Sequence, residues 1–173
     1  MPPLKREERA PDQAFDADER LYRRFPPECL SPWGEVVASK IGCSFEDDIE
    51  SCPSTVRGKY GTPADVLHAD CAGGNDVSTQ LVAYLISGEL PANVKTGQEN
   101  VVSDKDEYFD FYPFHDPEVN CYAHSVIASR KRTSPPETYD RPTSGVRNKL
   151  KAAFVSAFRS RRIDVQREEP DAQ

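Results

Sequence analysis

The stretch LVAYLI, from Leu81 to Ile86, is the most apolar run of the chain. Its short length and the Gly and Asn residues near it favour a buried strand in the middle of a sheet over a helix. Other β-prone runs are bounded by turn residues such as Pro26 and Pro27. We therefore expect strands near residues 20–25, 35–39, 80–87, 108–113 and 119–128.

Two helices are expected beside this sheet. Thr62 can cap a short helix in which Pro63 takes the first position and Asp65 lies near the positive end of the dipole. A second, amphipathic helix is expected after Ser144, which can cap it. Its large apolar side chains fall four residues apart on one face: Val146, Leu150, Phe154 and Phe158. The sequence thus predicts a small α+β domain, a mostly antiparallel sheet packed by a short helix and a C-terminal amphipathic helix.

Composition divides the chain of 173 residues into five segments. The first residues are rich in Asp and Glu and poor in apolar side chains, so burial cannot offset the entropy of ordering them. We expect a disordered acidic tail at 1–19, the α+β domain at 20–129, a basic Pro-rich linker at 130–143, the basic helix at 144–163 and a disordered tail at 164–173.

Charge is unevenly distributed along the chain. The net charge is −7. Residues 1–129 carry 11 basic and 23 acidic side chains, whereas residues 130–162 carry 10 basic and 2 acidic ones. Nucleic acid is therefore a possible partner of the region from Arg130 to Arg162. The alternative is that this region docks against its own acidic body or keeps a solvated surface.

The five cysteines are widely spaced, and none forms a Cys-x-x-Cys pair. An odd number without a secretion signal argues against a disulfide framework and against a zinc ribbon. We expect reduced, mostly buried thiols in a cytoplasmic protein. No apolar run approaches the ~20 residues of a membrane-spanning helix, so we expect no membrane association. The cysteines are Cys29, Cys43, Cys52, Cys71 and Cys121.

The block from His115 to Ser125 is the richest in chemistry-bearing side chains. We expect His124 and Asn120 to share one strand face, with His115 brought close by a turn. His124 is then a candidate general base or phosphate contact, because an unperturbed imidazole titrates near neutral pH. The alternative is structural: Asn120 holds the turn and His124 is a hydrogen-bonded core residue.

Arginines form a second group of candidates. Arg23 and Arg24 lie on the strand expected at 20–25 and must point to opposite faces. An inward guanidinium suits phosphate or carboxylate, so Arg24, Arg57 and Tyr60 are candidate ligand-binding residues. The alternative is salt bridges between arginines and the acidic body.

A metal site would have to use His115, Cys121 and His124, with Asp116 as a further ligand. Zinc accepts these ligand types, but the second cluster that would complete a tetrahedral site is missing. We therefore predict neither a metal nor a cofactor.

Several segments resemble a widespread family of small uncharacterised bacterial proteins. The similar segments are an N-terminal Leu21-Tyr22-Arg23-Arg24, a stretch around Ser54 to Arg57, and Asp116-Pro117, Asn120 and Ala123-His124. The resemblance spans about residues 20–130. It implies that this part folds as one unit, and it implies no activity.

The order of three residues is also similar to that in NAD-consuming ADP-ribosyltransferase-like toxins. These proteins place an Arg on the first strand, a Ser or Tyr on a middle strand and an acidic residue later. Arg23, Ser54 and Glu118 would take these places, with Glu107 as a second choice for the acid. This resemblance is a fold-level analogy.

Three functions remain open at this point. The chain lacks a Walker A loop, a His-Glu-x-x-His motif and a Gly-x-Ser-x-Gly motif. We therefore favour a non-catalytic cytoplasmic bacterial interaction or accessory module with a protein partner. One alternative is an enzyme acting on a nucleotide or NAD; the other is nucleic-acid binding. The candidate catalytic residues are His124, His115, Asn120, Arg23 and Ser54.

Overall fold

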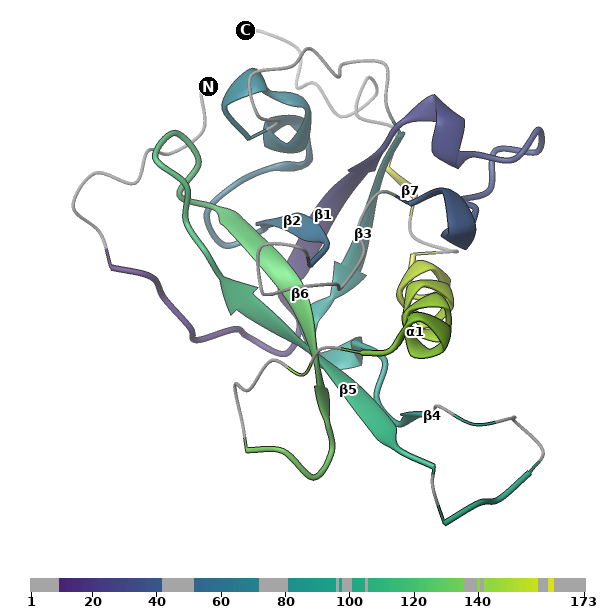
Figure 1. The fold of residues 1–173 in the computed structure, drawn as a ribbon. Coiled ribbons are helices and arrows are strands. Elements are labelled where there is room, and N and C mark those ends of the chain that lie inside the picture. Colours follow the sequence, from purple (N-terminus) through teal and green to yellow (C-terminus); the bar gives the residue numbers. More distant parts are fainter. Residues whose placement is uncertain are drawn as a thin grey trace, which may run out of the picture.

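A seven-stranded antiparallel sheet forms the body of the protein, with strand order β4-β5-β6-β2-β1-β3-β7 and one α-helix beside it (Figure 1). The computed structural model describes residues 10–41, 52–71, 81–95, 97, 101–104, 106–135, 140, 142–158 and 162–163. The strands are β1 Arg20–Phe25, β2 Ser54–Arg57, β3 Leu81–Ile86, β4 Val94–Lys95, β5 Tyr108–His115, β6 His124–Lys131 and β7 Arg162–Ile163.

Short 3-10 helices and one α-helix complete the described elements. They are η1 Pro27–Cys29, η2 Ala38–Lys40, η4 Pro63–Leu67, η5 Ala69–Cys71, η6 Ser87–Glu89 and α1 Ser144–Ser156. The short helix expected after Thr62 is the 3-10 helix η4, whose start is held by Asp65. Its Oδ2 accepts a hydrogen bond from the Thr62 backbone N–H at 2.6 Å. No described helix has the length and apolar character needed to cross a bilayer.

The apolar run at Leu81–Ile86 is a strand, as predicted. This strand, β3, lies between β1 and β7 and pairs with both in antiparallel register. Val82, Ala83 and Leu85 are each 1% exposed, so side chains from both faces of the strand are buried. This explains why the run is continuously apolar instead of alternating.

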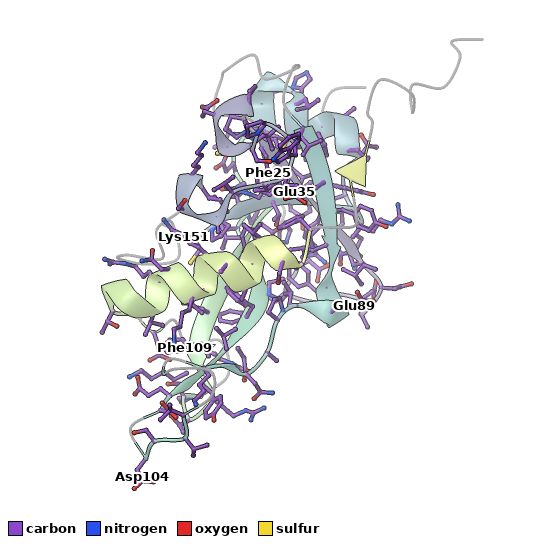
Figure 2. All side chains as sticks on the ribbon, turned by 90° about the vertical axis from the view of Figure 1, so that its right-hand side faces the viewer. Phe25, Glu35, Glu89, Asp104, Phe109 and Lys151 are labelled. Atoms are coloured by element: carbon purple, nitrogen blue, oxygen red, sulfur yellow. A yellow bond between two sulfur atoms is a disulfide. The ribbon has the colours of Figure 1, made fainter. Side chains whose placement is uncertain are left out.

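Each face of the sheet carries its own apolar cluster. One cluster lies between the sheet and α1 and includes Leu21, Phe25 and Phe154. The other lies on the opposite face and includes Tyr22, Val56, Val66 and Cys71. Neighbouring residues of β1 thus alternate between the two clusters. Figure 2 looks onto α1, with the buried Phe25 and Phe109 of the first cluster labelled on either side of it.

The helix α1 is shorter than expected. Its apolar residues Val146, Leu150 and Phe154 are buried against the sheet. The helix ends at Ser156 and not near residue 163, because Arg162–Ile163 pairs with β3 as the edge strand β7. Thr143, and not Ser144, occupies the N-cap position. Free hydrogen-bonding groups at the edge of β3 thus decide the structure of residues for which the sequence favours a helix.

Two expected strands differ from the observed ones. Within 35–39, Val36 forms only an isolated bridge with Leu30, and η2 follows. The strand expected at 119–128 is β6, which begins at His124 after a turn closed by a bridge between Glu118 and Cys121. It continues through Lys131, so the basic linker does not begin at residue 130. The short strands β2, β4 and β7 were not among the expected strands.

The cysteines correct the expectation of reduced thiols. Cys71 and Cys121 form a disulfide with a Cα–Cα distance of 5.2 Å, closing a loop with a sequence separation of 50. Cys29 and Cys52 are buried and lie outside this disulfide, and burial raises the pKa of Cys29. Cys43 lies outside the described residues. Sequence spacing could not reveal the pair, because the sheet brings the two segments together.

Candidate functional site

His115 is a buried structural residue and has no free ring nitrogen. Its side chain is at the end of β5 and is 0% exposed. The Nδ1 atom accepts a hydrogen bond from the Asp12 backbone N–H at 2.8 Å. The Nε2 atom must therefore carry the proton and donate it to the Tyr122 carbonyl oxygen at 2.7 Å. The ring is neutral, and burial lowers its pKa. These contacts give His115 a structural role, and its catalytic role stays a prediction.

Arg57 is the second candidate that the structure places in an internal network. It lies at the end of β2 and is 0% exposed. Its Nε and Nη2 atoms donate to the two carboxylate oxygens of Glu19, each at 2.8 Å. Its Nη1 and Nη2 atoms also donate to the carbonyl oxygens of Asp12 and Ala14, and its guanidinium lies 3.7 Å from the ring centroid of Phe15.

Tyr60 binds the same N-terminal segment. Its hydroxyl donates to Asp12 Oδ2, and Lys59 Nζ donates to the same oxygen at 3.0 Å. These two hydrogen bonds, with that of Tyr60 the stronger influence, hold the pKa of the Asp12 carboxyl well below its usual range. The Tyr60 ring also stacks on His115, with centroids 5.6 Å apart.

Residues 10–19 are therefore not the disordered tail that the composition predicts. They lie across the ends of β2 and β5 and are held by Arg57, Lys59, Tyr60 and His115. Figure 1 shows this purple segment running toward β1. Few apolar side chains are needed, because hydrogen bonds and two ion pairs, Arg57–Glu19 and Lys59–Asp12, order the segment. Arg57 and Tyr60 bind the protein's own chain, and their role in ligand binding stays a prediction.

The neutral state of His115 makes stability depend on pH. Its folded pKa is lowered, so the unfolded chain takes up a proton before the folded protein does as the pH falls below about 6.5. We expect the unfolding free energy to decrease by up to about 1.4 kcal/mol per pH unit in that range. Urea unfolding of the protein at a series of pH values measures this slope.

The matched variants are His115→Gln and His68→Gln. His68 lies on the surface, with a side chain that is 42% exposed. We expect His115→Gln to remove most of the slope and His68→Gln to retain it. An unchanged slope in His115→Gln would show that other groups cause the pH dependence.

Ser54 and His124 form the one contact between candidate catalytic side chains among the described residues. Ser54 begins β2 and is exposed, whereas His124 begins β6 and is 6% exposed. Its Nδ1 atom donates to the Asp116 carbonyl oxygen at 2.6 Å. The Nε2 atom of a neutral ring must then accept, and it lies 3.2 Å from Ser54 Oγ. A serine hydroxyl thus donates to an imidazole held in one tautomer.

Charged side chains surround this pair. Glu118 Oε1 lies 3.6 Å from His124 Nε2, and Asp116 Oδ2 lies 4.0 Å from Nδ1. Arg23 Nη1 donates to the Ser54 carbonyl oxygen at 2.6 Å, and its guanidinium lies over Phe154 on the α1 face. Both acidic groups can stabilise a protonated imidazole.

Arg24 points to the opposite face from Arg23, as the strand alternation predicts. Its Nη1 atom donates to the Cys71 carbonyl oxygen at 3.1 Å, and burial lowers the pKa of its guanidinium. This is the face of Val56, and therefore also that of Ser54 two residues earlier. Arg23 thus binds the Ser54 carbonyl oxygen, whereas Arg24 binds residues of η4 and η5 on the opposite face of the sheet.

Asn120 does not join this group. It is exposed in the turn between Glu118 and Cys121, so it shares no strand face with His124. Glu118 was foreseen only through the resemblance to toxins, and the Asp116 carbonyl was not foreseen at all. A backbone acceptor has no side-chain signature in a sequence.

A metal site does not form in the part of the chain that the structure describes. No group of three His, Cys, Asp or Glu side chains is suitably placed there. Both ring nitrogens of His115 are bonded, and Cys121 is in the disulfide.

Basic side chains of the region 130–162 contact the chain itself. Lys131 Nζ lies 3.1 Å from Glu107 Oε1, and Arg132 Nε lies 3.9 Å from Asp110 Oδ2. Lys149 donates to the Gly97 carbonyl oxygen. These contacts favour the alternative in which basic residues dock on the acidic body.

Comparison with known proteins adds no relative: no protein-family model, no curated protein and no solved structure matches the chain.

Proposed function

We propose that the protein is a small interaction module that binds a partner protein through the turn carrying Trp33. Trp33 is the only tryptophan of the chain, and it is 87% exposed. Tryptophan is the residue most enriched among those that dominate binding energy at protein interfaces. An exposed indole on an ordered turn is therefore a suitable anchor for a partner.

The Trp33 turn is held by its own hydrogen bonds. The Gly34 N–H donates to the Ser31 carbonyl oxygen at 2.9 Å, and the Ser31 N–H donates to the Glu35 carbonyl oxygen at 2.7 Å. The Ser31 hydroxyl oxygen accepts from the Trp33 and Glu35 N–H groups. Gly34 has a φ of 76°, which a side chain would disfavour. A partner would bind a preordered turn and lose little entropy.

Acidic side chains near Trp33 indicate the chemistry of the partner. Glu28 and Glu35 are both exposed and lie on either side of Trp33 in the sequence. The first 129 residues carry an excess of acidic side chains. A partner with an apolar pocket bordered by Lys or Arg would match both the indole and the charge.

The dispersion of the candidate catalytic residues supports a binding role. Arg57, Tyr60 and His115 hold residues 10–19, and Asn120 is exposed in a turn. Among the described candidates, His124 contacts the Ser54 hydroxyl group, and Arg23 contacts only the Ser54 backbone carbonyl. The bacterial family, the cytoplasmic location, the NAD-acting enzyme and nucleic-acid binding stay predictions.

Trp33 can report directly on this proposed interaction. A partner captured by the full chain is purified and titrated against it while the tryptophan fluorescence is followed. We expect a blue shift and protection from acrylamide quenching, because the indole leaves water. Trp33→Ala should weaken binding about 30-fold or more, which corresponds to about 2 kcal/mol.

Val102→Ala is the matched control, because Val102 is 92% exposed on the β4–β5 loop. In Figure 2, Asp104 of the same loop is labelled below α1, whereas Glu35, two residues after Trp33, is labelled above it. This variant should bind as the parent protein does. Equal affinity of Trp33→Ala and the parent, or unchanged fluorescence on binding, would contradict the proposal.

A further inference from the structure

The contact between Ser54 and His124 has the arrangement of a nucleophile and its base. The Nε2 lone pair of His124 faces Ser54 Oγ at 3.2 Å. The other ring nitrogen is held by the Asp116 carbonyl oxygen at 2.6 Å. A nucleophile, a base within hydrogen-bonding distance and a third group that orients the base are the three parts of such sites.

The surroundings favour the charges that a reaction would produce. His124 becomes positive when it takes the serine proton, and Glu118 Oε1 lies 3.6 Å from its Nε2 atom. Asp116 Oδ2 lies 4.0 Å from Nδ1. Both carboxylates stabilise the imidazolium.

Arg24 lies on the same face of the sheet as Ser54. In the register of β1 with β2, Tyr22 pairs with Val56, and both belong to the apolar cluster on that face. Arg24 and Ser54, each two residues from this pair, project from the same face. The Arg24 guanidinium donates to the carbonyl oxygens of Val66 and Cys71 and puts a positive charge on the face where an oxyanion would form.

Ser54 is accessible to solvent and His124 is shielded from it, which suits a nucleophile and its base. Ser54 is exposed, so an electrophile can reach its hydroxyl group from solvent. His124 is 6% exposed and fixed by hydrogen bonds on both ring nitrogens. A fixed, shielded base beside an accessible hydroxyl group loses little entropy on reaching the reactive geometry.

We infer that Ser54 is a nucleophile activated by His124 and that it reacts with carboxylic esters. Ser54 Oγ would form a bond to the ester carbonyl carbon while its proton moves to His124 Nε2. The bond from that carbon to the alkoxy oxygen then breaks, and the same proton moves to the leaving alcohol. Water would hydrolyse the resulting acyl-serine by the same proton route. This inference does not depend on the Trp33 interaction.

A fluorophosphonate probe tests the inference on the full chain. Its phosphorus resembles the tetrahedral carbon of an acyl-transfer intermediate, and a bond to Ser54 Oγ would displace fluoride. We expect one adduct per chain, located on Ser54 by peptide mass spectrometry. Ser54→Ala should abolish it, and His124→Gln should slow it by about 100-fold or more. Ser156→Ala is the control, because Ser156 is an exposed serine whose hydroxyl donates to the Ala153 carbonyl oxygen.

The parent protein gives a second readout that needs no variant. Glu118, Asp116, Arg23 and Arg24 are the charged groups around the pair. Labelling of Ser54 no faster than that of Ser156 would overturn the inference, and so would unchanged labelling of Ser54 in a folded His124→Gln variant. If His124→Gln does not fold, the comparison of Ser54 with Ser156 in the parent protein decides the matter.

Discussion

Arg57→Met is expected to lower the unfolding free energy by about 3–5 kcal/mol, the usual effect of removing one partner from a buried ion pair. Arg57 is 0% exposed and Glu19 is 7% exposed. The substitution leaves the Glu19 carboxylate buried without its two guanidinium hydrogen bonds. It also removes the hydrogen bonds to the carbonyl oxygens of Asp12 and Ala14. Urea unfolding followed by circular dichroism measures the loss.

Lys59→Met is the matched control for this variant. Lys59 also binds the N-terminal segment, through Asp12, but its side chain is 38% exposed. A partly exposed ion pair contributes at most about 1 kcal/mol. Limited proteolysis should cleave residues 10–19 of Arg57→Met sooner than those of Lys59→Met, because this segment loses its main anchor. Equal stability of the two variants would show that the buried pair does not hold the segment.

The double variant Arg57→Met/Glu19→Gln shows how much of the lost unfolding free energy comes from leaving the Glu19 carboxylate buried without a partner. If most of the loss comes from the unpaired carboxylate, neutralising Glu19 should recover part of it. Recovery in the double variant identifies the ion pair itself as the source. A further loss equal to the sum of the single effects would mean that the two side chains act independently.

Replacing Cys71 and Cys121 by Ala is expected to cost about 4 kcal/mol, because the disulfide closes a loop of about 50 residues in the unfolded chain. For a chain of this size, such a loss lowers the melting temperature by roughly 8–16 °C. Thermal unfolding with and without reductant measures it. Reductant should destabilise the parent protein and leave the double alanine variant unchanged.

Thiol alkylation before and after reduction provides the direct check. Mass spectrometry should find Cys71 and Cys121 modified only after reduction, and the buried Cys29 modified once the protein is unfolded. Alkylation of Cys121 without reduction would contradict the disulfide. The same measurement on protein taken directly from cells tests the cytoplasmic location, since disulfides are rare in reducing compartments.

The local sequence pattern predicted the elements in which the residue types match the burial of each position in the fold. The run Leu81–Ile86 is apolar on both faces because both faces are covered, and β1 and β5 lie where β-prone residues indicate strands. The short strand β2 was not predicted, although Thr55, Val56 and Arg57 are all buried. Four residues are too few for a clear period, and long-range pairing with β1 and β6 decides their structure.

The sequence indicated candidate residues for the site, but it did not indicate which of them lie close together in the fold. His115 and His124 lie nine residues apart, yet one binds the N-terminal segment and the other binds Ser54. A turn at Glu118–Cys121 replaces the expected continuous strand and separates their environments. Sequence distance within the block from His115 to Ser125 therefore did not indicate proximity in space.

The sequence by itself determined the α+β character of the chain, its apolar strand at Leu81–Ile86 and the apolar spacing of α1, since each depends on neighbours within a few residues. Only the tertiary structure decided the binding of residues 10–19 by Arg57, the Cys71–Cys121 disulfide and the pairing of Ser54 with His124. Each of these joins segments at least 38 residues apart. Contacts at such separations form only when the folded chain brings the two segments together, so a local sequence pattern does not indicate them.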